Sequence, residues 1–178
     1  MTDSLQKNEL LAQTAHAQAA QIVQSLAAAL TQRGWMMTSA ESCTGGLIAA
    51  ACTDLAGSSD WFERGFVTYS NAAKTELLGV PPALIAQHGA VSEPVVRAMA
   101  AGAVAHSAAH VSLAVTGVAG PTGGSEDKPV GTVWFGWCVG GQCSTERQLF
   151  AGDRASVRAQ SAQHALAGLL ARVRAVAD

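Results

Sequence analysis

Residues 35–55, W-M-M-T-S-A-E-S-C-T-G-G-L-I-A-A-A-C-T-D-L, decide the fold, because their pattern changes halfway. Residues 35–40 are short, apolar and bounded by polar residues, which is typical of a β-strand. Residues 47–55 form an apolar stretch of helical character. Gly45 and Gly46 stand before it, where a tight turn is expected. The order strand, glycine turn, helix predicts one unit of an α/β fold.

The rest of the chain alternates in the same way. Helices are predicted from about residue 4 to 33 with Gly34 as the stop, over 71–78 with Gly79 as the stop, from a Ser92 cap to about 109, and over 153–176. Strands are predicted over 64–69, 110–115, 130–139 and 142–150, the last two joined by a Gly140-Gly141 turn. Helices alternating with strands, plus one hairpin, predict a three-layer α/β/α sandwich with a mixed β-sheet.

Length and composition favour one globular domain over residues 1–178, with helix 1–33 packed on it or extending from it. Hydrophobic residues make up 49% and charged residues 13%, and the formal net charge is −2. The 11 basic residues are scattered among 13 acidic ones, so a nucleic-acid partner is not expected. A polar beginning and the lack of a long apolar run indicate a cytoplasmic protein without a membrane segment.

The four cysteines, Cys43, Cys52, Cys138 and Cys143, lack the paired spacing of a zinc site, and no metal is expected. A two-residue turn at Gly140-Gly141 would place Cys138 and Cys143 opposite each other. A reducing compartment argues against structural disulfides, so we predict that these two are reduced cross-strand neighbours.

Ser42 is the candidate nucleophile. It lies where a strand gives way to a glycine turn and a helix, so its hydroxyl would be presented beside backbone N–H groups and the positive end of the helix. Such an arrangement suits a nucleophile with an oxyanion hole. The alternative is that Ser42 or Thr44 only caps the helix while Gly45 and Gly46 allow the turn.

Lys74 is the candidate base, since none of the five histidines lies in a promising context and no Ser-His-Asp order is evident. A lysine in an apolar site loses its charge readily and can then accept the serine proton. Tyr69, five residues earlier, is placed to orient the lysine or to relay a proton. The alternatives are a solvated lysine and a packed tyrosine with a satisfied hydroxyl.

Two further stretches indicate a bound anion. Residues 116–125 are rich in glycine and allow the backbone to approach a ligand, although the G-K-[ST] ending of a P-loop is missing. Gly152-Asp153-Arg154 places a guanidinium at a helix N-terminus, where phosphate is favoured. The alternative is that Arg154 and Arg158 are ordinary surface residues.

Together these stretches resemble the CinA C-terminal domain family. The matching segments cover nearly the whole chain from about Trp35 onward, in the family's order. They are A-E-S-C-T-G-G (40–46), V-T-Y-S-N-A-A-K (67–74), L-L-G-V (77–80), H-G-A-V-S (88–92), V-T-G-V-A-G-P-T-G-G (115–124), K-P-V-G-T-V (128–133) and G-D-R-A-S-V-R (152–158).

The resemblance implies hydrolysis of the carboxamide of nicotinamide mononucleotide without a cofactor. It makes Ser42 the nucleophile, Lys74 the base and Tyr69 its neighbour, with backbone N–H groups around Gly45 and Gly46 holding the oxyanion. The residues expected at the small-molecule substrate are Thr44, Gly45, Gly46, Asn71, Thr116, Gly117 and Arg154. Full-length relatives carry an additional N-terminal domain that resembles molybdopterin-binding domains. This chain lacks such a domain, so its pyrophosphatase activity is not expected here.

Two rival functions stay open on the sequence. One is a non-catalytic nucleotide-binding or regulatory module of the same fold, and the other is an amidase that acts on a different small amide. The alanine-rich N-terminal helix offers a surface for self-association, so a homo-oligomer, in the simplest case a dimer, is expected.

Overall fold

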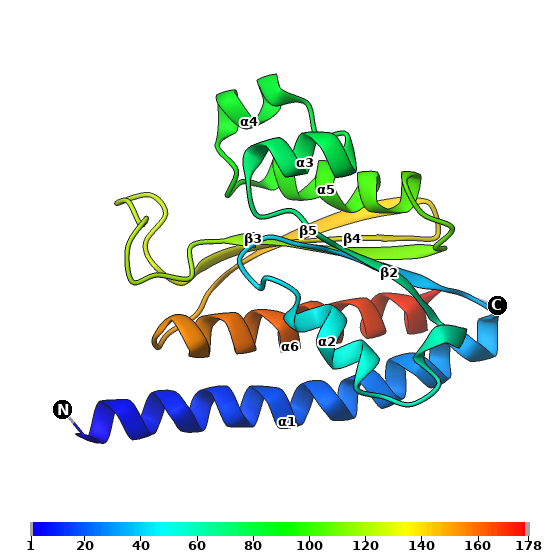
Figure 1. The fold of residues 1–178 in the computed structure, drawn as a ribbon, viewed down its shortest axis with the longest axis horizontal. Coiled ribbons are helices and arrows are strands. Elements are labelled where there is room, and N and C mark those ends of the chain that lie inside the picture. The colour runs from blue at the N-terminus through cyan, green and yellow to red at the C-terminus, as the bar shows by residue number, and fades with distance from the viewer. Residues whose placement is uncertain (1, 177–178) are drawn as a thin grey trace.

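The computed structural model describes residues 2–176, which form one five-stranded sheet covered by helices on both faces (Figure 1). In chain order the elements are α1 (Thr2–Arg33), β1 (Met37–Glu41), α2 (Leu47–Thr53), the short 3-10 helix η1 (Ser58–Asp60), β2 (Phe62–Val67), α3 (Asn71–Leu78), α4 (Pro82–His88), α5 (Glu93–Ala105), β3 (Val111–Gly117), β4 (Thr132–Val139), β5 (Gln142–Leu149) and α6 (Arg154–Ala175).

The strand order is β2-β1-β3-β4-β5. Strand β1 pairs in parallel with β2 and β3, while β3 with β4 and β4 with β5 are antiparallel. The parallel strands are joined through helices and the antiparallel pair β4–β5 by a tight turn, as these connections require. The predicted mixed sheet is therefore confirmed.

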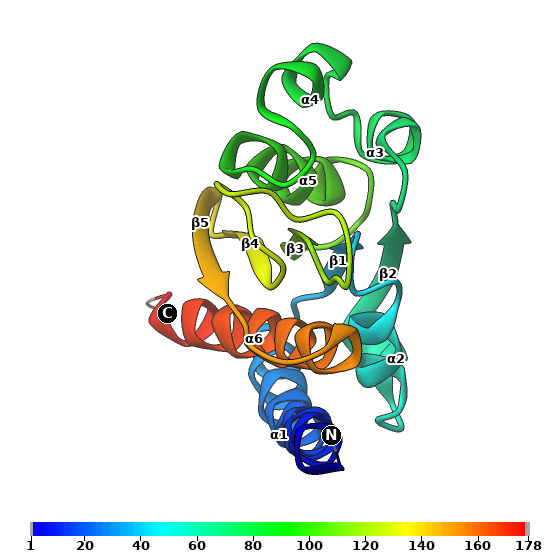
Figure 2. The same ribbon diagram turned by 90° about the vertical axis from the view of Figure 1, so that its left-hand side faces the viewer.

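The helices lie in layers on the two faces of the sheet (Figures 1 and 2). Helix α5 packs on β3 and β4, with α3 and α4 outside it, and this side holds a core around Met99 and Val95. Helices α2 and α6 cover the other face, and α1 packs along the outside of α6. Helix α1 buries Val23, Leu26 and Leu30 in the larger core of that side. The apolar face of α1 is thus packed within its own chain, while Leu5 and Leu10 at its beginning are exposed.

The β4–β5 hairpin has the predicted two-residue turn. Gly140 and Gly141 have φ values of 60° and 77°, a left-handed backbone that glycine adopts without a steric penalty. Cys138 and Cys143 lie directly opposite each other, with Cα atoms 4.1 Å apart. The two are joined by a disulfide, so the prediction of reduced thiols is wrong for this structure. The physical reason is the register, which brings the two sulfur atoms within bonding reach.

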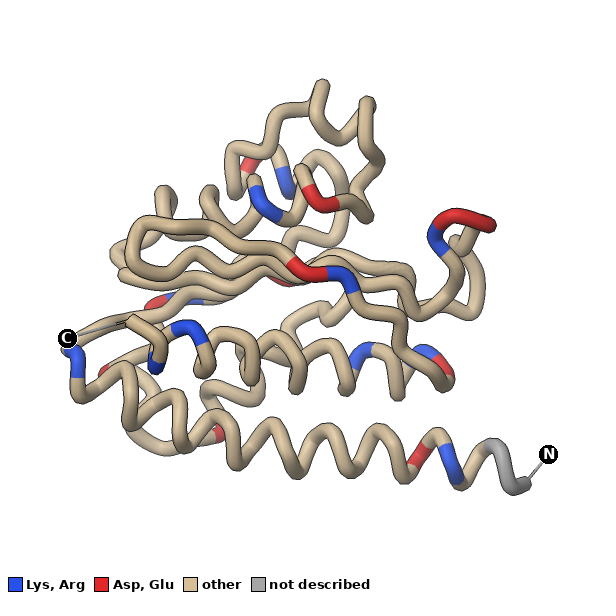
Figure 3. Tube along the Cα trace, turned by 180° about the vertical axis from the view of Figure 1, so that it is seen from behind, with Lys and Arg blue, Asp and Glu red and all other residues tan. Residues whose placement is uncertain are grey.

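Two short helices and several element ends were not predicted. Helix α4 follows Pro81, and η1 precedes β2. The strand predicted over 64–69 covers Phe62–Val67, and the helix after Ser92 ends at Ala105. Within the described part of the chain, no helix has the length and apolar character to cross a membrane. Basic and acidic residues are interspersed along the described trace (Figure 3).

Candidate active site

The predicted site residues gather at one edge of the sheet, where the parallel strands β1, β2 and β3 end. Ser42 follows β1, Tyr69 follows β2, and Thr116 is the second-last residue of β3. This edge faces the viewer in Figure 2, together with the start of α6. In open α/β sheets, ligands bind outside the carboxyl ends of the strands. The topology therefore places a candidate active site here.

Ser42 and Lys74 form a direct pair. The Lys74 Nζ lies 3.0 Å from Ser42 Oγ and donates a second hydrogen bond to the carbonyl of Thr68 at 2.8 Å. Lys74 projects from α3 and is only 1% exposed, which excludes a solvated lysine. Ser42 is held by its own N–H, which donates to the Val115 carbonyl at 3.0 Å. The two groups are in hydrogen-bond reach, as a nucleophile and its base must be.

Burial lowers the pKa of Lys74 below its ordinary value of 10.5, because the desolvated ammonium form is disfavoured. The nearby Cys43 has a smaller, opposite effect on this pKa. A lowered pKa increases the fraction of neutral amine near pH 7, and only the neutral amine can accept a proton.

The turn between β1 and α2 depends on Gly45 and Gly46, whose φ values are 59° and 98°. Neither Ser42 nor Thr44 caps α2, since its N-cap is Gly46 and no side chain bonds there as an N-cap. Thr44 is fully buried, and its hydroxyl has no partner within residues 2–176. The capping alternative for Ser42 is therefore excluded.

Glu41 takes the positive end of α2, a role that the sequence analysis missed. Its buried carboxylate accepts from the N–H groups of Gly46 at 2.9 Å, Ile48 at 3.1 Å and Ala49 at 2.9 Å. The N–H of Gly45 donates to the Ser42 carbonyl at 3.1 Å. The N–H groups of Gly45 and Gly46 themselves are thus already bonded within the protein. The expectation that backbone N–H groups around these two glycines hold an oxyanion stays a prediction. The available signal in the sequence was an acidic residue, Glu41, directly before the turn that leads into the helix.

Arg158, one of two arginines near the start of α6, contacts the same turn. Its Nε donates to the Cys43 carbonyl at 3.1 Å and its Nη2 to the Thr44 carbonyl at 2.8 Å. A Cβ added at Gly45 would lie 3.3 Å from Nη2, so the turn and the guanidinium fit closely. Arg158 is half-buried and is therefore not an ordinary surface residue.

Cys43 stands next to Ser42 and is a potential competing nucleophile. Burial raises the pKa of its thiol to about 12. Since the thiolate is the reactive form of cysteine, a thiol with this pKa is inert near pH 7. Ser42 therefore remains the nucleophile candidate of this turn.

Tyr69 and Arg154 are brought together, but not as the sequence predicted. The Tyr69 side chain is 62% exposed, and its hydroxyl accepts from Arg154 Nη2 at 3.0 Å. Only the Tyr69 carbonyl lies near Lys74 Nζ, at 3.5 Å. Arg154 Nη1 donates to the Gly120 carbonyl at 2.8 Å, so this arginine joins the end of β2 to the glycine-rich loop.

Thr116 and Gly117 are the last two residues of β3 and lie directly before the glycine-rich loop. Thr116 is buried, and its hydroxyl donates to the Ala90 carbonyl at 2.9 Å. A Cβ at Gly117 would lie 2.7 Å from the Val133 side chain, so the close approach of β4 requires glycine here. Among residues 2–176, no group of three or more His, Cys, Asp or Glu side chains is placed to hold a metal ion.

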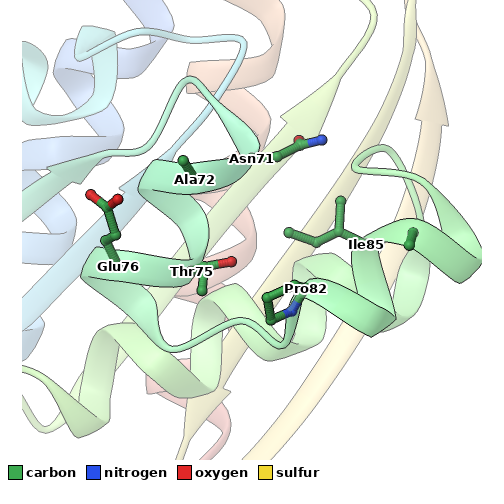
Figure 4. A pocket seen from close by; sticks show the side chains of 7 residues that line it. Asn71, Ala72, Thr75, Glu76, Pro82 and Ile85 are labelled. Atoms are coloured by element: carbon green, nitrogen blue, oxygen red, sulfur yellow. The ribbon is translucent and has the colours of Figure 1, made fainter.

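Asn71 lines a pocket of about 400 Å³ between α3 and α4 (Figure 4). Thr75 and Glu76 contribute polar groups, and Pro82 and Ile85 line its apolar part. Lys74 is on the same helix but does not line this pocket. The structure thus places Asn71 beside a separate cavity from the Ser42–Lys74 pair.

The fold and the site define an α/β protein with a buried serine–lysine pair at the carboxyl edge of its sheet. The family model of the CinA C-terminal domain matches residues 19–173, and the chain belongs to this family.

Named relatives agree with this membership. The chain is 58% identical over 142 residues to the nicotinamide-nucleotide amidohydrolase PncC of Enterobacter agglomerans. The matched region covers 79% of this chain and 87% of that protein. The PncC protein of Escherichia coli strain K12 is 54% identical over 147 residues, covering 82% and 89%. The crystal structure of the competence damage-inducible protein A from Klebsiella pneumoniae is similar, with a TM-score of 0.86, 42% identity and coverage of 89% and 99%.

Proposed function

We propose that this chain hydrolyses the carboxamide of nicotinamide mononucleotide to nicotinate mononucleotide and ammonia, with Ser42 as nucleophile and Lys74 as base. The observation that carries the mechanism is the 3.0 Å contact between Lys74 Nζ and Ser42 Oγ in a buried site. The relatives at 54–58% identity are named nicotinamide-nucleotide amidohydrolases, which supports the substrate. We assign the reaction to pyridine nucleotide salvage.

Acylation begins with the neutral Lys74 amine. The Thr68 carbonyl holds one amine hydrogen, which leaves the lone pair available to the Ser42 hydroxyl. Lys74 accepts the hydroxyl proton while Oγ attacks the carboxamide carbon, and a tetrahedral oxyanion forms. Lys74 then returns this proton to the leaving nitrogen, the C–N bond breaks, and ammonia departs from an ester with Ser42.

Deacylation uses the same two groups. Neutral Lys74 accepts a proton from water, whose oxygen attacks the ester carbon. The second tetrahedral intermediate breaks at the bond to Ser42 Oγ, which takes the proton back from Lys74. Nicotinate mononucleotide leaves, and both side chains return to their first state. None of these steps calls for a redox change.

The phosphate of the substrate is assigned to Arg154. Its guanidinium lies at the N-terminus of α6 between Tyr69 and the glycine-rich loop, both at the carboxyl edge of the sheet. A guanidinium combines bidentate donors with the favourable end of a helix dipole for this purpose.

The decisive experiment measures ammonia release from nicotinamide mononucleotide with the wild type and with Ser42→Ala and Lys74→Met. Each variant should lose activity by more than about tenfold while its circular dichroism stays unchanged, because each lacks one half of the activated nucleophile. Thr53→Ala, a change on the exposed side of α2, serves as the matched control and should retain activity.

The rival functions give different results in the same experiment. A wild type that binds the mononucleotide but releases no ammonia would be a non-catalytic nucleotide-binding module. A wild type that releases ammonia only from other small amides would be an amidase of different specificity. Full activity of either variant on the mononucleotide would refute the serine–lysine mechanism.

A further inference from the structure

We propose that Arg158 is a positioning residue that aims the N–H of Thr44 at the oxyanion of the tetrahedral intermediate. This inference rests on the proposed function and extends it. Arg158 itself is not placed on the substrate. It acts through the Cys43 and Thr44 carbonyls, to which its guanidinium donates at 3.1 Å and 2.8 Å.

Most N–H groups of the nucleophile turn already have an acceptor within the protein. The N–H of Ser42 donates to the Val115 carbonyl, that of Gly45 to the Ser42 carbonyl and that of Gly46 to the Glu41 carboxylate. The N–H of Cys43 hydrogen-bonds to its own side-chain sulfur. Among the residues that the structure describes, this leaves the N–H of Thr44 without a protein acceptor. Thr44 is the second residue after the nucleophile and belongs to the same turn, and backbone N–H groups placed beside a nucleophile act as oxyanion donors in acyl transfer.

The contact with Arg158 fixes the direction of the Cys43–Thr44 peptide. This peptide is trans, so its carbonyl and its N–H point in opposite directions. Its carbonyl points to Arg158 on α6, and its N–H, that of Thr44, therefore points away from α6. Helices α6 and α3 lie on opposite faces of the sheet (Figure 2), and Lys74 reaches Ser42 from α3. The Thr44 N–H is thus directed toward the side where the reacting carboxamide must meet Ser42 and Lys74.

Arginine suits this positioning role better than lysine does. The planar guanidinium fixes two neighbouring carbonyls at once, which a lysine ammonium does not do with the same geometry. Its positive charge also polarises the peptide that it holds, and hydrogen bonds to a charged donor are stronger than neutral ones. A preorganised donor of this kind contributes to kcat because it needs no reorganisation when charge develops.

The experiment compares Arg158→Ala with Arg172→Ala. Arg172 is a matched control on the same helix, since its Nη1 donates to the Gly168 carbonyl at 2.9 Å and its guanidinium lies over Trp137, away from the turn. With nicotinamide mononucleotide, Arg158→Ala should lower kcat by about 100-fold, the loss typical of a disturbed oxyanion donor, with little change in KM. Added guanidinium chloride at low concentration should raise kcat of Arg158→Ala but not of Arg172→Ala.

A second readout does not depend on the substrate. A fluorophosphonate labels an activated serine when Oγ attacks phosphorus and fluoride leaves, and its phosphoryl oxygen uses the same donor. Labelling of Ser42 should be slower in Arg158→Ala than in wild type and unchanged in Arg172→Ala. If Arg158→Ala does not fold, Arg158→Lys keeps the charge and should show the same loss of kcat and labelling.

The outcomes separate the two proposals. A wild type that neither releases ammonia nor is labelled at Ser42 overturns the proposed function and this inference with it. An active wild type with an Arg158→Ala variant of similar kcat overturns only the role of Arg158. A raised KM at unchanged kcat also overturns it, because it would place Arg158 on the substrate.

Discussion

Replacement of the buried Glu41 by glutamine tests how the nucleophile turn is anchored. The carboxylate accepts from three backbone N–H groups in the first turn of α2, at 2.9, 3.1 and 2.9 Å, and is fully buried. Glutamine has nearly the same volume but only one acceptor oxygen. Its amide would keep the N–H groups of Gly46 and Ile48 and would turn its NH₂ toward the N–H of Ala49.

The size of the effect follows from these contacts. One buried N–H loses its acceptor, which costs about 1–3 kcal/mol, and the two retained bonds lose their charge-assisted part. Removal of the charge also removes part of the free-energy cost of burying it, which offsets some of this loss. We therefore expect the free energy of unfolding to fall by about 2–4 kcal/mol in Glu41→Gln, a large part of the 5–15 kcal/mol typical of a whole protein. For a chain of this size, the melting temperature should fall by roughly 4–16 °C.

Thermal and urea unfolding followed by circular dichroism measure this loss. Glu93→Gln is the control, because Glu93 is exposed and its ion pair with Arg97 on α5 is screened by water. Its melting temperature should scarcely change. A drop of less than about 2 °C for Glu41→Gln would show that the three hydrogen bonds do not stabilise the turn as argued.

The remaining predictions concern the site. Because burial lowers the pKa of Lys74, kcat/KM should rise with pH at an apparent pKa below 10.5. Lys74→Arg should be inactive, since a guanidinium does not release its proton in this range. An active Lys74→Arg variant would show that another group is the base. The unfolded chain holds the lysine proton up to about pH 10.5 while the folded chain releases it earlier, so stability relative to Lys74→Met should rise with pH in that window. Urea unfolding at a series of pH values measures this, and a fall would contradict it. Arg154→Ala should weaken use of the mononucleotide far more than use of the riboside, and equal losses in kcat/KM would place Arg154 away from the phosphate.

Local signals in the sequence were sufficient for much of the fold. The short helical stretch that ends at Gly79 predicted α3 over 71–78. The two glycines of the β4–β5 hairpin predicted its turn. Helix α4 was not predicted, although proline fits the first turn of a helix, as Pro82 does here. Ser92 occupies the predicted cap position of α5, yet its hydroxyl donates to the Gly89 carbonyl instead of capping the helix.

The site was predictable in its reactive pair and less so in its supporting groups. Ser42 and Lys74 were found because a hydroxyl needs a base and the histidines offered none. The roles of Glu41 and Arg158 depend on which backbone groups they meet, and Arg158 meets its partners 114 and 115 residues away along the chain. No local pattern reports a contact of this length. The direction of the Tyr69 side chain toward Arg154, 85 residues away, was unpredictable for the same reason.

The spacing of Arg154 and Arg158 has a mechanical consequence. Residues four apart lie on adjacent turns of one face of a helix. The Arg154 guanidinium donates to the glycine-rich loop and the Arg158 guanidinium donates to the nucleophile turn. Helix α6 therefore connects these two segments at two points on one face. A rotation or shift of α6 must therefore displace the glycine-rich loop and the nucleophile turn together. The loop proposed to bind the phosphate and the turn proposed to attack the amide therefore cannot move independently of each other, and the pitch of a single helix sets the spacing of their two attachment points.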